Sequence, residues 1–291
     1  MTDNLVTPFH LEGQPVRGRV VRLGTVLDEI LRAHQLPTPV ARLLGEAVIT
    51  AALAGSSLKF EGRVIVQANG AGPVSFLVSD FTTDGGLRGY IRYDAEALPE
   101  QPQPDLASLM GAGQFALTID PGKAEHRYQG IAALETSSFA ATAEAYFRQS
   151  EQLPSQLVVA IAQITDQTGQ TSWRGGGLLA QRIASDETDK TDAWTTAKAM
   201  IATIADDELT DPMLGTETLL FRLFHQQGVR MFDPLALYKR CTCTKTRLRQ
   251  VLANFSRGER NEMLSDAGQI EMTCEYCAKT FGFTPDELEP S

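Results

Sequence analysis

The sequence predicts an α+β fold, in which an antiparallel-sheet core domain with packed helices precedes a helical linker and a small C-terminal domain. Three observations predict this organisation. Strand-like runs joined by short turns dominate residues 1–183, apolar residues at helical spacing dominate residues 184–231, and all four cysteines fall within residues 232–291. These three ranges are the predicted domains.

The core domain is expected to hold strands with short connections, which join neighbours in antiparallel order. Between residues 63–68 and 74–80 a hairpin turn is expected that opens with Asn69-Gly70, because both residues tolerate positive φ. Another turn is expected at Gly175, Gly176 and Gly177, between the last two strands. The expected strands are residues 17–23, 63–68, 74–80, 87–93, 114–120, 126–134, 157–165 and 178–183.

Helices are expected at residues 25–34, from Thr38 onward, and at about 138–151, packed on this sheet. Thr38 is predicted as the N-cap of the second helix and Pro39 as its first residue. This helix carries an apolar stripe at helical spacing, formed by Val40, Leu43, Leu44, Ala47, Val48 and Ala51.

The linker, residues 184–231, opens with a polar, acidic stretch and continues with two helix candidates. The second candidate runs from residue 216 to 227, with Gly228 as its C-cap. Their combined apolar face is too small to stand alone and is expected to dock on another part of the protein. The residues of this face are Trp194, Ala197, Ile201, Ile204, Leu219, Leu220, Leu223 and Phe224.

Composition excludes several classes of protein. The 291 residues include 43% hydrophobic and 21% charged residues, which excludes a disordered chain and a collagen-like fibre. The net charge of −10 argues against a surface that binds nucleic acid throughout. The least polar stretch, residues 47–55, is far shorter than the ~20 residues that span a bilayer. Because residues 1–13 show no signal-peptide pattern, a cytoplasmic location is expected.

The four cysteines form two close pairs, Cys241-x-Cys243 and Cys274-x-x-Cys277, with thirty residues between the pairs. Two such pairs, folded together, supply four thiolates to a tetrahedral Zn²⁺. A domain of about sixty residues seldom folds without a metal or a disulfide, which supports a structural zinc ion. Four ordinary buried thiols and an iron–sulfur cluster are the alternatives that the spacing leaves open.

The surroundings of the first pair also suit reversible oxidation. Residues at i and i+2 come close enough for a local disulfide. Residues 239–260 carry seven basic side chains and one acidic side chain, and this positive charge stabilises thiolates. The same stretch is also compatible with a solvated helix face or with a nucleic-acid contact.

No pattern outside the cysteines indicates catalysis, so the protein is expected not to be an enzyme. The sequence contains no P-loop and no G-x-S-x-G motif, and Gly111-Ala-Gly113 lacks the third glycine of a dinucleotide-binding loop. The histidines stand alone, without ligand or triad spacing; they are His10, His34, His126 and His225.

Besides the cysteine pattern, the chain contains a series of short phrases in order: VARLLGEA (40–47), GSSLKFEGR (55–63), GLRGYIRY (86–93), LMGAG (109–113), YQGIAAL (128–134), YFRQSEQLPS (146–155) and GGGLLAQ (175–181). In these phrases and in its cysteines the chain resembles, nearly end to end, the redox-regulated 33-kilodalton heat-shock chaperone family. The chain departs from the family's usual sequence at residues 244–246, which are Thr-Lys-Thr, and this departure bears on the oxidation threshold.

The resemblance implies a redox switch. In such proteins the reduced form binds one zinc ion and is inactive. Peroxide with heat, or hypochlorous acid, releases the metal and forms two disulfides, which by position are Cys241–Cys243 and Cys274–Cys277. The linker then loosens and binds unfolding clients without ATP. The oxidised protein forms a homodimer, and clients pass to ATP-dependent foldases. The implied client-binding residues are Trp194, Ile201, Ile204, Leu219, Leu220, Leu223 and Phe224.

Two other functions compete with this interpretation. A zinc-ribbon protein that binds nucleic acid through residues 239–260 would show salt-dependent binding in the metal-bound state. A thiol–disulfide oxidoreductase using Cys274 and Cys277 would turn over small disulfides. The net charge of −10 weighs against the first, and the absence of a thioredoxin-like βαβ pattern weighs against the second.

Overall fold

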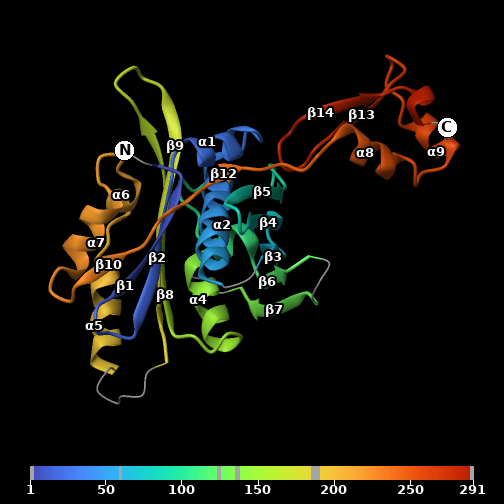
Figure 1. Ribbon diagram of the computed structural model, residues 1–291. Helices are drawn as coiled ribbons and strands as arrows, with labels where there is room; N and C mark the ends of the chain where they lie inside the picture. The colour runs from blue at the N-terminus through green and yellow to red at the C-terminus, as the bar shows by residue number, and fades with distance from the viewer. Residues whose placement is uncertain (1–2, 59–60, 123–125, 135–137, 185–190, 289–291) are drawn as a thin grey trace. The chain divides into compact units, whose positions relative to one another are not determined.

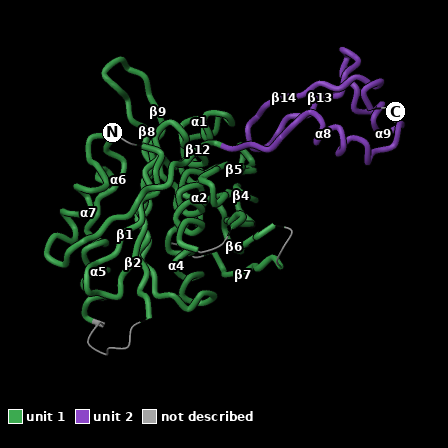
Figure 2. The backbone as a smooth tube through the Cα atoms, in the orientation of Figure 1, with its two compact units in different colours: residues 1–239 green, residues 240–291 purple. Residues whose placement is uncertain are grey.

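The computed structural model divides into two compact units, residues 1–239 (unit 1) and 240–291 (unit 2), shown separately in Figure 2. It describes residues 3–58, 61–122, 126–134, 138–184 and 191–288. The acidic start of the predicted linker, residues 185–190, therefore lies outside the described residues. The boundary between the units falls eight residues after the predicted start of the C-terminal domain at residue 232.

The described residues of unit 1 form two six-stranded sheets. Sheet A has the order β10-β1-β2-β9-β8, and β11 pairs with the N-terminal end of β1. All its pairings are antiparallel, as predicted. Its strands are β1 (Leu5–Leu11), β2 (Val16–Leu23), β8 (Ser155–Thr165), β9 (Thr171–Arg182), β10 (Val229–Met231) and β11 (Leu235–Ala236).

Sheet B has the order β12-β5-β4-β3-β6-β7. The pairing of β12 with β5 is parallel, and the other pairings are antiparallel. The parallel strand joins the C-terminal end of unit 1 to a sheet built from its middle. The strands are β3 (Arg63–Gly70), β4 (Val74–Thr82), β5 (Gly86–Tyr93), β6 (Gly113–Asp120), β7 (Tyr128–Ala133) and β12 (Tyr238–Lys239).

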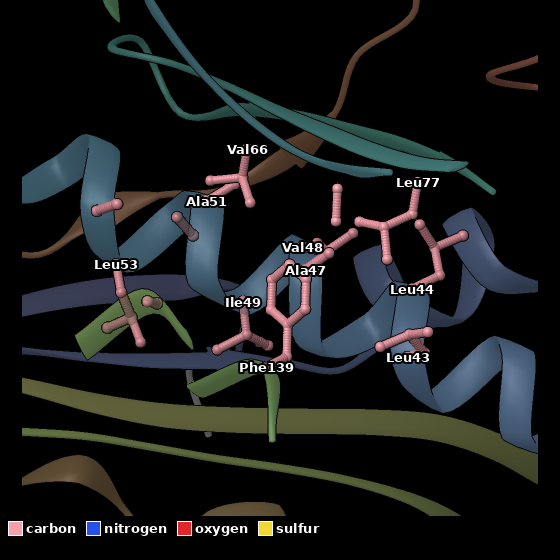
Figure 3. Close-up of a cluster of buried hydrophobic side chains, with 14 of the residues drawn as sticks. Leu43, Leu44, Ala47, Val48, Ile49, Ala51, Leu53, Val66, Leu77 and Phe139 are labelled. Carbon is pink, nitrogen blue, oxygen red and sulfur yellow. The ribbon is translucent and has the colours of Figure 1, made fainter. Parts of the chain in front are cut away.

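Helix α2 (Thr38–Ser57) lies between the two sheets and contacts strands of both (Figure 1). Its side chains form the centre of the main core, together with residues such as Val66, Leu77 and Phe139 (Figure 3). By length and composition alone α2 could cross a membrane, but 83% of its most apolar window is buried inside the protein, as in a core helix. The other helices of this region are α1 (Thr25–Arg32), α3 (Leu106–Met110) and α4 (Phe139–Gln149).

The opposite face of sheet A is covered by three helices of the predicted linker (Figure 1). These are α5 (Thr191–Ile201), α6 (Asp206–Thr210) and α7 (Thr216–Phe224), which we call the covering layer. The predicted need to dock is met here, because the apolar sides of α5 and α7 pack against β1, β2 and β9. Burying such side chains contributes about 1.5–3 kcal/mol each.

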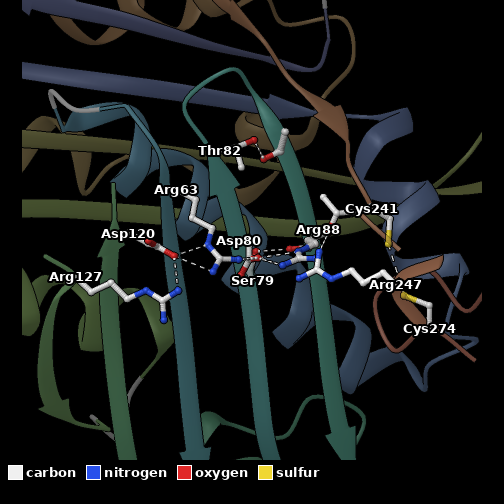
Figure 4. A network of polar contacts seen from close by, with 12 residues as sticks. Arg63, Ser79, Asp80, Thr82, Arg88, Asp120, Arg127, Cys241, Arg247 and Cys274 are labelled. Carbon is white, nitrogen blue, oxygen red and sulfur yellow. Dashed lines mark hydrogen bonds and ion pairs between the residues drawn. The ribbon is translucent and has the colours of Figure 1, made fainter. Parts of the chain in front are cut away.

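A row of charged residues crosses the outer face of sheet B (Figure 4). Asp80 accepts hydrogen bonds from Arg88, and its carboxylate lies 3.5 Å from an Arg63 nitrogen. Asp120 accepts from Arg63 at 2.9 Å and pairs with Arg127 at 3.0 Å. Both carboxylates are buried, so the arginines offset the cost of removing these charges from water.

Unit 2 is a small α+β fold with its own core. It consists of α8 (Lys245–Leu252), α9 (Arg257–Glu262), the hairpin β13 (Ile270–Thr273) and β14 (Thr280–Phe283), and a 3₁₀ turn (Pro285–Leu288). The buried side chains of its core are Leu252, Ile270, Phe283 and Leu288. Four buried residues make a core too small to hold about fifty residues by apolar burial alone.

The predicted hairpin between residues 63–68 and 74–80 is present as β3 and β4, but its turn begins two residues later than predicted. Asn69 and Gly70 lie at the end of β3, paired with Gln114 and Gly113, and the turn follows them. The turn predicted at residues 175–177 is wrong. The glycines at 175–177 lie inside β9, paired with both β2 and β8. Glycine is needed at these strand positions because neighbouring groups occupy the space where a side chain would stand.

The N-cap of α2 and the first strand also differ from prediction. Pro37 is the N-cap and Thr38 the first helical residue, with no capping hydrogen bond from a side chain. Strand β1 is not predicted because Pro8 interrupts its apolar alternation. Pro8 lies between the β1 segments that pair with β10 and β11, where the ladder on that side is interrupted.

Candidate metal centre

The four cysteines come from two segments of unit 2. Cys241 and Cys243 lie in the extended segment before α8, and Cys274 and Cys277 lie in the turn between β13 and β14. The first segment is held at its end by Thr244, whose hydroxyl accepts from the Arg247 N–H at 3.2 Å and caps α8. Each pair is therefore fixed by the element that follows or encloses it.

The β13–β14 turn folds tightly around the second pair. The Cys274 N–H donates to the Lys279 carbonyl at 3.0 Å, and the Ala278 N–H donates to the Cys274 carbonyl at 2.8 Å. Ala278 has a φ of 55°, in the left-handed region that glycine adopts more easily. The backbone of the turn is therefore strained at Ala278, and this conformation places both sulfurs on one side.

The four Sγ atoms lie within 4.8 Å of one another. Across the pairs, Cys241 Sγ and Cys274 Sγ are 3.6 Å apart (Figure 4), and Cys243 Sγ and Cys277 Sγ are 3.4 Å apart. All four are free thiols. Four Zn–S bonds of ~2.3 Å in a tetrahedron place sulfurs ~3.8 Å apart, so this cluster has the size that a zinc ion requires.

Local interactions shift the pKa values of the thiols in different directions. Burial raises the pKa of Cys241 and of Cys243, and the neighbouring thiols raise that of Cys243 further. Burial also acts to raise the pKa of Cys274, but N–H groups of Tyr276 and Cys277 donate to its sulfur, and the net result is a lowered pKa. Hydrogen bonds from the turn therefore stabilise a thiolate at Cys274.

The donor set fits a structural metal. Among the described residues, the four cysteines are the cluster of His, Cys, Asp and Glu that could hold an ion. Sulfur ligands alone favour zinc or an iron–sulfur cluster over hard cations. Four protein ligands leave no open coordination position, as in structural zinc sites. The chemistry available here is metal binding and thiol oxidation.

The basic stretch near the cysteines is largely solvated. Lys245, Arg247, Arg249 and Arg257 are exposed. Lys245 pairs with Glu287 at 2.7 Å, and Arg247 donates to the Thr242 hydroxyl at 3.2 Å. These contacts favour the solvated-face interpretation of the stretch over an arginine array in direct contact with the sulfurs.

The predicted client-binding residues all lie in the covering layer or beside it. Trp194, Ile201, Leu219, Leu220 and Phe224 are buried, at 7% exposure or less. Ile204 and Leu223 are partly buried and pack against the same clusters. In this state the residues are core side chains of unit 1, as the docked arrangement requires.

The sequence prediction did not identify the surface beneath these residues. It is formed by the outward side chains of sheet A: Phe9, Leu11, Val16, Val20, Leu178 and Ala180. Alternation in β1 and β2 carries a signal for it, because Phe9 and Leu11, like Val16 and Val20, recur at even spacing. The prediction also missed α6, whose Leu209 is buried against Ala160.

Comparisons with known proteins agree on one family. Residues 4–284 match the family described as Hsp33 protein. The chain is 47% identical over 289 residues to the 33 kDa chaperonin of Caulobacter vibrioides, covering 97% of this chain and 95% of that protein. It is 36% identical to the 33 kDa chaperonin of Aeromonas salmonicida, covering 99% and 94%.

A solved structure has the same fold. The crystal structure of the 33 kDa chaperonin, or heat shock protein 33 homolog, from Thermotoga maritima is similar with a TM-score of 0.80 at 24% identity, covering 98% of this chain and 96% of that one. The α+β fold with antiparallel sheets, the four-cysteine cluster and the match over nearly the whole length lead to one conclusion: the chain belongs to the Hsp33 family of heat-shock chaperones.

Proposed function

We propose that this protein is a redox-regulated, ATP-independent holdase chaperone. In the proposed cycle the reduced, metal-bound form is inactive. Oxidation of the cysteines unfolds the C-terminal domain, loosens the linker and exposes an apolar surface that holds unfolding proteins. The observation that carries the proposal is the approach of all four Sγ atoms to within 4.8 Å of one another.

A bound Zn²⁺ would supply folding energy to the C-terminal domain. Structural zinc contributes about 10–16 kcal/mol of apparent binding free energy in small zinc-finger peptides. The core of unit 2 has four buried apolar side chains, so its fold would depend on the ligands Cys241, Cys243, Cys274 and Cys277. Loss of those four ligands removes the main source of stability of the domain.

The proposed oxidation is balanced by two molecules of peroxide. Each hydrogen peroxide takes two electrons from one pair of cysteine sulfurs, which form one disulfide. The peroxide also takes up two protons, from the thiols or from solvent, and leaves as two waters. By position in the family pattern the disulfides are Cys241–Cys243 and Cys274–Cys277.

The covering layer provides the proposed client surface. Its apolar side chains and the outer face of sheet A are buried against each other. If the covering layer separated from sheet A, the apolar side chains of both would be exposed, including Trp194, Ile201 and Phe224. A large apolar patch on a chain of net charge −10 can bind unfolded segments and stay in solution.

The remaining parts of the proposal extend the same cycle. The working domains are residues 1–183, 184–231 and 232–291, the oxidised protein is a homodimer, and ATP-dependent foldases receive its clients. The proposed location is the cytoplasm, where reducing conditions keep the cysteines as thiols until stress occurs.

An aggregation assay tests the proposal. Light scattering of a thermally unfolding client is followed with reduced, zinc-loaded protein and with peroxide-treated, zinc-free protein. Suppression by the oxidised form alone is expected, reversed when a reductant and zinc are restored. Thiol titration should find four protected thiols per zinc before oxidation and none after. Equal suppression by both forms would exclude a redox switch.

A matched pair of variants tests the metal site, and two assays test the rival functions. The Cys243→Ser/Cys277→Ser variant should lose zinc and its redox response, whereas Thr242→Ser should retain both. Salt-dependent nucleic-acid binding by the zinc-loaded form would favour a zinc-ribbon protein. Turnover of a small disulfide substrate by Cys274 and Cys277 would favour an oxidoreductase.

A further inference from the structure

Two arginines of sheet A hold the C-terminal turn of α6. Arg22 of β2 donates to the main-chain carbonyl of Glu208 at 2.9 Å and also to that of Asp211. Arg174 of β9 donates through Nε to the carbonyl of Thr210 at 3.0 Å. The last carbonyls of a helix lack partners within the helix, so these guanidinium groups satisfy them.

The two arginines are themselves fixed in place. Arg174 forms a bidentate pair with the Asp3 carboxylate, with N–O distances of 2.6 and 2.8 Å. Arg22 is 4% exposed. Burial and the charge of Arg174 lower the pKa of Arg22, while Asp3 and Asp211 oppose that effect. An arginine side chain does not lose its proton in proteins, so the guanidinium group of Arg22 donates these hydrogen bonds as a cation.

A glycine beside the arginines lets the backbone of α6 approach β9 closely. A Cβ on Gly176 would stand 2.2 Å from the carbonyl oxygen of Leu209 and 3.2 Å from its Cβ. Real Cβ atoms do not approach an oxygen so closely, so α6 would have to move away. The adjacent glycines at 175 and 177 face the opposite side, toward side chains of the main core.

These contacts involve the main chain of α6 more than its side chains. Three carbonyls accept from the arginines, and one apolar side chain, Leu209, is buried at 2% exposure. The carboxylates of Asp206 and Asp207 belong to exposed residues. Docking of α6 therefore depends on a helical turn that ends at the right place and carries one apolar residue.

We infer that Arg22, Arg174 and Gly176 form a recognition site for the C-terminal turn of α6, which positions the covering layer on sheet A by main-chain contacts. We call it the α6 seat. Every contact of the seat described above lies within residues 3–211, in unit 1. The seat therefore holds α6 without any contribution from the four cysteines.

Hydrogen–deuterium exchange on the reduced, zinc-loaded full chain tests this inference. Arg22→Gln, Arg174→Gln and Gly176→Ala should each raise the exchange rate of amides 206–211 by about tenfold or more, the scale of hydrogen bonds to charged groups. Asp3→Asn should act in the same direction through Arg174. Four protected thiols and one zinc per chain should be retained in every variant.

Matched controls distinguish recognition by the main chain from general damage. Gly215→Ala adds a Cβ that meets no atom within 4 Å, and Asp207→Asn keeps the side-chain oxygen that accepts from the Glu208 N–H. Both controls should exchange like the unaltered protein. Arg174→Lys should behave like Arg174→Gln, because an ammonium group cannot replace the fork that joins Asp3 to Thr210.

Two results would overturn the inference. One is exchange of amides 206–211 at the unaltered rate in both Arg22→Gln and Gly176→Ala. The other is faster exchange there that is matched in β2, β8 and β9, because that pattern reports loss of sheet A rather than release of α6. If an arginine variant does not fold, Gly176→Ala and Arg174→Lys still decide between these outcomes.

Discussion

The rings of Phe9 and Phe224 stack with their centroids 5.9 Å apart and an interplanar angle of 28°. Phe9 belongs to β1 of sheet A, and Phe224 is the last residue of α7 in the covering layer. Both side chains are almost completely buried. The stack is therefore a direct apolar link between the sheet and the helices that cover it.

Phe224→Ala should weaken the covering layer. Removal of a buried phenylalanine costs about 3–5 kcal/mol, because the lost burial is joined by a cavity. The reduced, zinc-loaded variant should bind an apolar dye and be cleaved within residues 191–224 faster than the unaltered protein. Phe221→Ala is the matched control on the same helix, since Phe221 is 63% exposed, and no change is expected.

Glu46 should give unit 1 a pH-dependent stability around neutrality. Burial, assisted by the charge of Asp206 and opposed by Arg42, raises its pKa to about 7. An unfolded chain titrates the same group near 4.3. Because the folded pKa is the higher one, folding favours the protonated form, and stability should rise as pH falls from about 8 to about 5.

Glu46→Gln measures that effect. The amide has no charge to lose, so thermal unfolding of the variant should vary less between pH 5 and 8. At pH 8 the variant should be more stable by about 1–3 kcal/mol. An unaltered pH profile in the variant would show that Glu46 does not titrate in this range.

Ala278→Gly should tighten metal binding. Ala278 has a φ of 55°, which costs an L residue about 1–2 kcal/mol and glycine almost nothing. A turn that holds Cys274 and Cys277 with less strain should bind zinc several-fold more tightly in competition with a chelator. Ala278→Val should have the opposite effect, since a β-branched residue is still less compatible with this backbone. Equal affinities for the three proteins would contradict the prediction.

Arg63→Met should lower the stability of unit 1 by about 1.5–3 kcal/mol, the scale of hydrogen bonds to charged groups. Arg63 contacts both buried carboxylates of sheet B, Asp80 and Asp120. Urea unfolding at pH 7 measures the loss. Arg92→Met on the exposed part of β5 is the control and should change stability by less than about 0.5 kcal/mol.

The same variant should change the acid limb of the stability curve. Burial acts to raise the pKa of Asp120, but hydrogen bonds from Arg63 and Arg127 outweigh it and lower the pKa below its usual range. A depressed folded pKa gives stability that is present above about pH 4 and lost at lower pH. Without Arg63, less stability should be lost on acidification between pH 5 and 2.

The predictable parts of the fold are those in which local pattern and tertiary packing agree. Strands β3 to β6 alternate apolar and polar residues or lie between clear turns, and α2 has an apolar stripe between two sheets. The cysteine pairs were found because thiols at i, i+2 and i, i+3 have few structural reasons to occur together. The two pairs were enough to predict a shared four-sulfur site. The path of the chain that brings the pairs together depends on the fold of residues 244–273, which the spacing does not specify.

The unpredicted parts depend on distant segments. Gly176 carries no local sign that α6 will lie against it, so three consecutive glycines read as a turn instead of a strand. Arg22 and Arg174 look like ordinary solvated strand residues until α6 supplies carbonyls to them. Strand β1 pairs with residues near 230, and a pairing over such a distance cannot be detected in a short stretch of sequence.

The pairing of β1 with β10 also constrains how the chain folds during synthesis. Phe9 pairs with Met231, more than 200 residues later, and Leu5 pairs with Ala236. At about 5–20 residues per second, the ribosome needs roughly 10 s or more to supply these partners. Until then the open edge and apolar face of β1 stay exposed to other nascent chains. Sheet A therefore has a high contact order, and its completion waits for nearly the whole of unit 1.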